Sequence, residues 1–474
     1  MNSALIAMFA AGGHAHNVPP WQQYLFVGIL VLMILTLALE EKLHAKKSVI
    51  VGTFAVLCLI IATAMGHLPL GPITNVFGEK LPVPLYITAV DWSVVAIILG
   101  SSIFVDVTSR SGLFTWIAIK LTKASKGDPL RLLYFYGGMT VLFSAVLNNV
   151  TAMIIVGSLT GVSLKKLGRE DKLLGFLLVE GLLTNIGGLL TLISSVPNII
   201  VENAAKISFI RFFLNASPYV VIATIATLIL GAKLFKIESL KDDDEKATAQ
   251  ELVQSFDEND GIESRGFFFF GAVMTGLFIL VMATTSLLPV IKELKLGFVA
   301  LTFGLIMLWR YKNDVEQFFA AVDWDLLAFF GSLFIVINVM EHMQVLTLIG
   351  VVLKKIIALG PTLGSGALLV TAAAFSSVTD NIPLAAMLSK ILTNVPGVSV
   401  ATATAKESSA WWSVIFGCNL GGNLTPIGSA STLVAVTIIH KYKLKLSFGD
   451  FVKKSFPFAV MHIILATIYV LAFL

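Results

Sequence analysis

Charged residues are scarce in this sequence, at 13% of its 474 residues, which is the first clue to its class. A soluble domain of that size carries roughly a quarter charged residues. Several apolar runs instead approach or exceed the ~18 residues that indicate a membrane span. The clearest runs are 24–39, 49–65, 213–231, 267–289 and 452–474. The sequence therefore predicts an all-α polytopic membrane protein, because barrel strands alternate in polarity whereas these runs are continuous.

Cysteine and clustered catalytic side chains are also lacking. The two cysteines, Cys58 and Cys418, lie in apolar segments, so no disulfide framework is expected. The sequence has no His, Asp and Glu cluster of the kind that an enzyme with a nucleophile and base, or with a metal, requires. The net charge of +4 comes from loops beside the membrane and gives no reason to expect nucleic acid as a partner. We expect no enzymatic activity and no cofactor, and the lipid bilayer as a partner.

An acidic stretch divides the chain into two similar halves. Three motifs of the first half recur in order in the second. They are VDW at 90–92 and 322–324, FSAVLNN (143–149) as FSSVTDN (375–381), and NIGGLLTLISSVPN (185–198) as NLGGNLTPIGSAST (419–432). Repeats in one order at nearly one offset indicate an internal duplication, which is common in secondary transporters. The predicted parts are an N-terminal segment with the first transmembrane helix (1–48), repeat 1 (49–236), an acidic cytoplasmic linker (237–266) and repeat 2 (267–474).

Basic residues predict a re-entrant hairpin in repeat 1, because cytoplasmic loops are rich in Lys and Arg. Basic clusters at 120–131 and 165–172 place both flanks of residues 131–165 in the cytoplasm. Each arm of this segment is shorter than the ~20 residues that a span needs. We therefore expect this segment to enter the membrane from the cytoplasm, turn at Asn148 and Asn149, and return to the cytoplasm.

The basic residues of the later loops, assigned to the cytoplasm in the same way, predict that repeat 2 is an inverted copy of repeat 1. Its hairpin, 363–400, then enters from outside, and a broken helix follows each hairpin, at 173–206 and at 410–440. Lys354 and Lys355 fit this topology only if they lie on an amphipathic helix at the membrane surface. Inverted repeats of this kind are typical of secondary transporters.

The breaks predict an ion site, because irregular backbone at membrane depth persists only inside protein or beside a wet cavity. Half-helix N-termini suit an anion, and unwound carbonyls with Ser, Thr and Asn oxygens suit Na⁺. We expect Na⁺ at both hairpin tips; the alternative is tight packing, in which Gly, Ser and Thr simply join membrane helices. The predicted cation- or substrate-binding residues are Ser144, Asn148, Asn149, Thr151, Gly187, Gly188, Ser194, Ser195, Asn198, Ser376, Ser377, Thr379, Asp380, Asn381, Gly421, Gly422, Asn423, Thr425, Ser429 and Thr432.

Three acids are candidates for proton coupling. Asp380 comes first, because an Asp at mid-membrane costs ~2.5–3.5 kcal/mol on insertion scales and usually has a role there. The alternative is that Asp380 only caps the helix that contains Pro383. Asp106 could be neutralised by Arg110 one turn away. Glu180 precedes the NIGG break and is either a proton carrier or a buried hydrogen-bonding group.

The ordered motifs resemble the ion transporter superfamily. This group includes arsenite permeases, NhaD-type sodium/proton antiporters, the P protein and divalent-anion/sodium symporters. The segments that carry the resemblance are VDWSVVAIILGSSIFVDVTSRSGLF, FSAVLNNVTAMI, NIGGLLTLISSVPNIIV, SSVTDNIPLAAM and FGCNLGGNLTPIGSASTLVA, within roughly residues 40–474. The P protein and NhaD-type branch is the most similar. The resemblance implies an elevator transporter that forms a homodimer, with cation sites at Ser144, Asn148, Asn149, Ser194 and Asn198, and at Ser377, Asp380, Asn381 and the 421–432 loop.

One departure from the resemblance bears on the function. That branch usually has an acid before the first hairpin Asn, where this chain has Asn148, so only the second tip keeps a titratable group. The sequence predicts a secondary active transporter of a small inorganic ion or anion in the plasma (inner) membrane, with Na⁺/H⁺ antiport as the first hypothesis. The alternative is Na⁺- or H⁺-coupled transport of an anion or oxyanion such as arsenite, silicate or a carboxylate.

Overall fold

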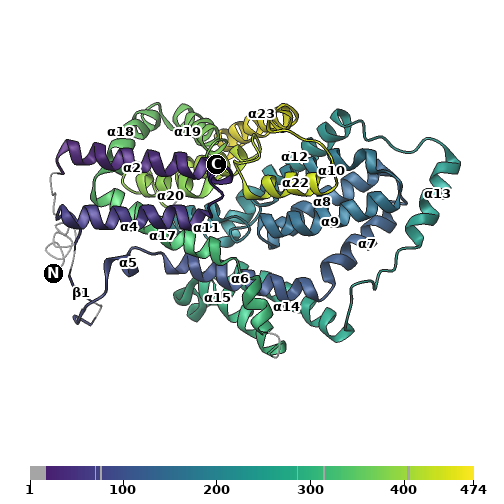
Figure 1. Ribbon diagram of the computed structural model, residues 1–474, viewed down its shortest axis with the longest axis horizontal. Coiled ribbons are helices and arrows are strands. Elements are labelled where there is room, and N and C mark those ends of the chain that lie inside the picture. Colours follow the sequence, from purple (N-terminus) through teal and green to yellow (C-terminus); the bar gives the residue numbers. More distant parts are fainter. Residues whose placement is uncertain (1–17, 70, 75–76, 286, 313–314, 403–405) are drawn as a thin grey trace. The chain divides into compact units, whose positions relative to one another are not determined.

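The protein is built almost entirely of helices (Figure 1). The computed structural model describes residues 18–69, 71–74, 77–285, 287–312, 315–402 and 406–474, so the first 17 residues of the predicted N-terminal segment lie outside it. In the described part, the only strands are β1 (Ile73–Thr74) and β2 (Lys80–Leu81), a short antiparallel pair. The prediction of a helical membrane protein is confirmed, with this pair as its one exception.

Eight helices of the described chain are long and apolar enough to cross a membrane. Each is a continuous apolar run whose backbone groups bond within the helix, as a hydrocarbon environment requires. They are α2 (Pro20–Ala38), α4 (Lys47–Ala64), α6 (Trp92–Arg110), α8 (Pro129–Val146), α12 (Phe209–Leu234), α14 (Arg265–Thr284), α17 (Trp324–His342) and α23 (Phe448–Phe473). The protein is therefore a multi-pass integral membrane protein.

The remaining helices are mostly shorter, and several come in pairs separated by a few residues. They are α3 (Glu40–Leu43), α5 (Leu85–Thr88), α7 (Leu113–Ala124), α9 (Asn149–Lys166), η1 (Glu170–Lys172), α10 (Leu173–Gly187), α11 (Val196–Ala205), α13 (Asp243–Gln254), α15 (Pro289–Arg310), α16 (Val315–Ala321), α18 (Val345–Ile357), α19 (Pro361–Ser376), α20 (Asn381–Leu392), α21 (Ser409–Gly421) and α22 (Ala430–Lys441). The series from α6 to α12 recurs as α17 to α23. Its first helices have 19 residues each and its last have 26 each.

The described residues form two compact units. The first takes the residues up to Asp91 together with Ala328–Ile349, and there α2 and α4 run side by side (Figure 1). Gly52 of α4 faces Ser332 of α17 in this unit. The second unit takes Trp92–Leu327 and Gly350–Leu474. All the predicted site residues lie in the second unit.

Two interlocked groups of helices form the centre of the second unit. Helix α10 packs against α8, α9 and α22, whereas α21 packs against α19, α20 and α11. The two groups correspond to each other. Helix α22 packs beside α9 and α10, and α11 packs in the equivalent position beside α20 and α21. In each half, the short helix that follows the broken helix therefore packs against helices of the other half.

Helices α6, α14 and α15 pack around aromatic side chains in the same unit. Phe104 stacks on Phe278 with ring centroids 4.4 Å apart, and Phe303 meets Phe104 edge-on at 6.1 Å. Beside them, Gly100 of α6 touches the backbone of Ala300 on α15, so closely that a Cβ atom at Gly100 would overlap the Ala300 carbonyl group. The absence of a side chain is what lets these two helix backbones meet.

We expect Gly100→Ala to destabilise the protein, because the added methyl group overpacks a contact made by backbone rather than by movable side chains. Overpacking of this kind costs about 1–3 kcal/mol. Thermal unfolding of the purified protein, followed by size-exclusion chromatography, measures the effect. Gly276→Ala on α14 is the matched control, because a Cβ atom there meets nothing within 4 Å. Equal melting temperatures for the two variants would contradict the close approach of α6 and α15.

The acidic linker contains a helix and forms ion pairs with basic residues of the second unit. It contains α13, and Glu258 beyond that helix pairs with both Lys120 and Lys123 of α7. The hydrogen bond from Lys120 is the largest cause of a lowered pKa at Glu258, and the positive charge of both lysines adds to it. Arg169, after the first hairpin, pairs with Glu245 of α13 at 3.3 Å. The linker therefore lies against the basic end of α7 and against Arg169, which follows α9.

Candidate functional site

The first break separates α8 from α9 by two residues, Leu147 and Asn148. Leu147 is extended, and Asn148 caps α9 by accepting a hydrogen bond from the Thr151 amide at 2.8 Å. Asn is among the best residues for this position, because its side chain satisfies an otherwise unpaired helix amide. The Ser144 hydroxyl lies 2.6 Å from the Thr184 carbonyl oxygen of α10. The tip is thereby tied to the neighbouring broken helix.

The second break is the loop at 188–195 between α10 and α11. The Ser194 hydroxyl donates to the Gly188 carbonyl at 2.7 Å, and the Asn198 amide donates to the same oxygen at 2.6 Å. Asn198 also donates to the Thr191 carbonyl at 3.0 Å. These side chains hold carbonyl groups that the interrupted helix leaves unpaired.

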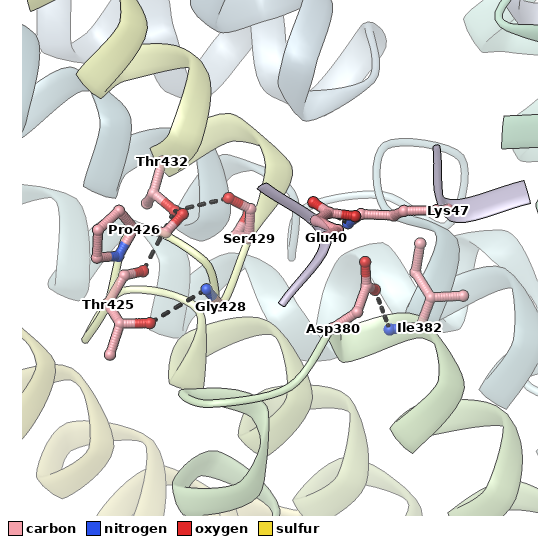
Figure 2. Close-up of polar contacts among 9 residues, drawn as sticks. All are labelled: Glu40, Lys47, Asp380, Ile382, Thr425, Pro426, Gly428, Ser429 and Thr432. Carbon is pink, nitrogen blue, oxygen red and sulfur yellow. Dashed lines mark hydrogen bonds and ion pairs between the residues drawn. The ribbon is translucent and has the colours of Figure 1, made fainter. Parts of the chain in front are cut away.

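The third break separates α19 from α20, and Figure 2 shows its tip. Asp380 caps α20 by accepting a hydrogen bond from the Ile382 amide at 2.9 Å (Figure 2). The Thr379 hydroxyl bonds back to the Phe375 carbonyl of its own helix at 2.8 Å. Asn381 is buried, with 9% of its surface exposed. The cap that Asp380 forms corresponds to the one that Asn148 forms at the first tip.

The fourth break is the loop at 422–429 between α21 and α22. The Thr432 hydroxyl lies 2.7 Å from the Ser429 carbonyl and 3.2 Å from the Pro426 carbonyl (Figure 2). The Thr425 hydroxyl accepts from the Gly428 amide at 3.2 Å (Figure 2). Thr432 thus does for this loop what Asn198 does for the loop after α10.

The four breaks share hydrogen bonds that recur at equivalent positions. In each half the hairpin serine donates to a carbonyl of the broken helix, and a threonine of the broken helix donates back to the hairpin backbone. The pairs are Ser144 to Thr184 and Ser376 to Cys418, then Thr191 to Ala145 and Thr425 to Ser377. The duplication seen in the sequence therefore extends to individual contacts.

Two reciprocal hydrogen bonds join the halves. The Ser195 hydroxyl, at the start of α11, donates to Asn419 Oδ1 on α21 at 2.6 Å. The Ser429 hydroxyl, at the start of α22, donates to Asn185 Oδ1 on α10 at 2.9 Å. All four residues are buried. A Ser–Asn hydrogen bond thus fixes the N-terminus of α11 to the second half and that of α22 to the first half.

Asn185 is the centre of the larger polar cluster. Besides the bond from Ser429, its Oδ1 receives hydrogen bonds from Ser431 at 3.1 Å and from Asn149 at 3.3 Å. Its amide donates to Asn423 Oδ1 at 2.9 Å. Asn185 is completely buried. One side chain therefore connects the first hairpin tip with the loop of the fourth break and with α22, the helix that follows it.

Several of the residues in this cluster were not among the site residues predicted from the sequence. Asn185 and Asn419 begin the repeated NIGG and NLGG motifs, so the repeat itself was a signal for them. His462 gave only a weak signal, as a lone histidine in an apolar helix. Its Nε2 lies 2.7 Å from the Thr227 hydroxyl, and its Nδ1 lies 3.2 Å from the Asn423 amide. It connects the cluster to α12 and α23.

Glycines let the broken helices approach the hairpins. A Cβ atom at Gly187 would lie 2.6 Å from the Val141 carbonyl oxygen, and one at Gly421 would overlap the equivalent carbonyl of Ala373. At Gly188 a Cβ atom would lie 2.7 Å from the Asn149 side chain. Gly422 is similarly enclosed by the backbone of Gly428. These glycines are needed for helix contact, which is the packing role weighed above.

Two of the three candidate acids lie away from the four breaks. Glu180 on α10 is completely buried, and its Oε1 accepts a hydrogen bond from Thr160 at 2.6 Å. Its Oε2 has no hydrogen-bond partner among the described residues. Asp106 lies 3.7 Å from the Arg110 guanidinium and is partly exposed. The structure places only Asp380 at a break.

Four interrupted helical segments, tied together by neutral polar side chains inside a multi-pass membrane protein, are typical of membrane transporters rather than enzymes. Residues 36–415 match the family model described as citrate transporter. The chain belongs to this family, within the ion transporter superfamily, and it is a secondary transporter. The resemblance derived from the sequence motifs is thereby confirmed.

The relatives are similar over most of the chain. An uncharacterized transporter of Mycobacterium tuberculosis is 29% identical over 383 residues, which cover 81% of this chain and 86% of the relative. The mouse P protein is 22% identical, over 94% of this chain and 62% of its own length. Among solved structures, the Alcanivorax borkumensis YdaH transporter aligns with a TM-score of 0.55 at 13% identity, over 90% of this chain and 98% of that one. This last similarity concerns the fold alone.

Proposed function

We propose that this secondary transporter moves a small carboxylate or related oxyanion, coupled to Na⁺ or H⁺. The observation that carries the proposal is the neutral junction of the four breaks. Its side chains are amides and hydroxyls, centred on Asn185 and Asn419, and Asp380 is the one acid at a break. Such a junction can bind an anion and a cation together without a strong fixed charge of either sign.

Helix ends provide the two kinds of ligand. The N-termini of α11 and α22 start at the paired residues Ser195 and Ser429, and helix N-termini favour negative charge. The C-termini of α10 and α21 end in loops whose carbonyl oxygens suit Na⁺. An anion near the N-termini and a cation near the carbonyls would stabilise each other, which is the physical basis of coupled transport.

The proposed movement is an elevator mechanism between two inverted repeats, 49–236 and 267–474. Support comes from the recurring helix series, the equivalent hydrogen bonds at the breaks, and the basic loops that predict opposite orientations. In this proposal the hairpins 131–165 and 363–400 re-enter the membrane and the broken helices move with them. A homodimer would supply a fixed frame for that movement.

Na⁺/H⁺ antiport, the first hypothesis from the sequence, is the second candidate. Two observations favour it: Asp380 stands at a hairpin tip, and Glu180 is buried with one oxygen that lacks a hydrogen-bond partner among the described residues. Either carboxyl group could exchange a proton for a cation. Against this, the first tip has Asn148 where an antiporter of the P protein and NhaD-type branch would have an acid.

Reconstitution into proteoliposomes separates the two functions. Labelled citrate is the first probe, because the family model carries that name; succinate and arsenite follow. We expect an inward Na⁺ or proton gradient to drive accumulation of one of these anions. A change in internal pH on adding Na⁺, without any anion present and without anion uptake, would instead establish antiport and overturn the first proposal.

A further inference from the structure

A cavity away from the four breaks combines positive charge with an apolar floor. It measures about 300 Å³ and lies in the second unit, where the end of α11 and the start of α12 meet α6 and the start of α15. Three of its lining residues are lysines, Lys206, Lys292 and Lys295, and one is a carboxylate, Glu202. The cavity therefore carries an excess of two positive charges.

The three lysines are available to a ligand. Each is exposed, and none takes part in an ion pair within the described part of the chain. Ser93 and Ser208 supply hydroxyl groups beside them. The deeper lining includes the apolar side chains of Ile97 and Phe209. Lysines around a low-dielectric floor attract anions more strongly than the same lysines on an open surface.

The backbone at Lys295 is an independent observation at the same place. Inside α15, Lys295 has φ 63° and ψ 177°, a combination that is essentially confined to glycine. A residue with a side chain is strained in this conformation, and such strained residues cluster at active sites and ligand sites. The kink interrupts the first turns of α15, next to Lys292. A strained backbone thus carries one of the three amines that line the cavity.

We propose that this cavity is an oxyanion-binding site, separate from the junction of the breaks. Its ligand carries a phosphate or carboxylate group that contacts Lys206, Lys292 and Lys295. Two sources share this chemistry: the headgroup of an anionic membrane lipid, and a soluble anion that gathers at the cavity. The proposal concerns binding alone, so it stands whichever solute the protein transports.

Two sets of probes distinguish the sources. Thermal unfolding of the full chain is measured in phosphatidylglycerol and in phosphatidylcholine nanodiscs, and in neutral detergent with inorganic phosphate or citrate, at constant ionic strength. Ligands that bind the folded state raise the melting temperature with concentration. Stabilisation by phosphatidylglycerol alone identifies a lipid site. Stabilisation by the soluble anions identifies a solute site in this cavity only if replacing its three lysines removes the effect, because a transported anion bound at the junction of the breaks would keep it. Absence of both effects overturns the proposal.

A matched pair of triple variants tests the location. Replacement of Lys206, Lys292 and Lys295 by Gln is expected to weaken binding of the effective probe at least about tenfold, since three charge-assisted contacts are lost. The control replaces Lys441, Lys443 and Lys445, which are exposed elsewhere in the second unit, and should bind like the parent chain. Equal losses in both variants would mean general surface charge and would contradict the site.

Lys295→Gly gives a result that a purely structural role cannot reproduce. Glycine relieves the backbone conformation, so the melting temperature without ligand should rise. The same variant loses an amine, so the probe should bind several-fold more weakly. A higher melting temperature with unchanged binding would remove Lys295 from the site, and unchanged binding in the triple variant as well would refute it altogether.

Discussion

Alanine at position 185 is expected to reduce transport at least about 100-fold. Asn185 accepts three hydrogen bonds and donates one, and it is completely buried. Without it, Ser429 and Ser431 lose an acceptor, while Asn423 loses a donor. Each buried polar group left unpaired costs about 1–3 kcal/mol, and the contributions do not simply add. The N-terminus of α22 would no longer be fixed to the other half.

Two measurements separate a local effect from unfolding. The initial rate of anion uptake reports transport, and thermal unfolding in detergent reports stability, which should fall by several degrees but leave a folded protein at 4 °C. Asn419→Ala should behave similarly, because it removes the reciprocal partner of Ser195. Asn394→Ala is the matched control, since that side chain is exposed. Transport by Asn185→Ala at the parent rate would show that the cluster is not part of the transport path.

Glutamine at position 180 is expected to remove proton-driven accumulation, by about 100-fold or down to leakage. The carboxyl group of Glu180 is completely buried, and no charged group pairs with it among the described residues. Burying an unpaired charge costs several kcal/mol. We therefore expect the group to hold its proton in this conformation and to release it when its surroundings change. Gln keeps the hydrogen bond from Thr160 but cannot carry a proton.

If Glu180 carries the proton, two assays of the Glu180→Gln variant should give opposite results: anion exchange should persist, and proton-driven accumulation of the anion should be lost. Glu180→Gln should still exchange internal for external anion, because exchange needs no net proton movement, while its response to a pH gradient disappears. Asp106→Asn is the control, since Asp106 is partly exposed and paired with Arg110. Unchanged proton-driven accumulation in Glu180→Gln would exclude this residue. Asp380→Asn would then be decisive, because Asn preserves the helix cap and removes only the charge.

The sequence predicted the helical membrane class because apolar runs record burial in lipid directly. The internal repeat could also be predicted, because similar motifs at nearly one offset are visible in the sequence without knowledge of the fold. The structure has its breaks between α8 and α9 and between α19 and α20, at the residues where Asn, Asp and Pro interrupt apolar runs. Helix capping preferences are local, so a single sequence reveals them.

Hydrogen-bond and ion-pair partners that are far apart in the chain could not be predicted from the sequence. Asn185 and Asn419 appeared only as the first letters of two motifs, because their roles depend on serines more than 200 residues away along the chain. His462 had no local pattern beyond being a lone histidine in an apolar helix. The contacts of the acidic linker could not be predicted either, because composition does not show that Glu258 pairs with a lysine of α7 and Glu245 with Arg169 after α9. Contacts of this kind require the folded arrangement.

The reciprocal Ser–Asn bonds impose an order of events on biosynthesis. Ser195 and Asn185 find their partners 224 and 244 positions further along the chain. During synthesis, the first half therefore enters the bilayer with polar groups that have no native partner until the last helices emerge. Water or lipid headgroups must solvate them meanwhile. We expect the nascent chain to depend on these transient partners during this interval, whatever the stability of the finished molecule.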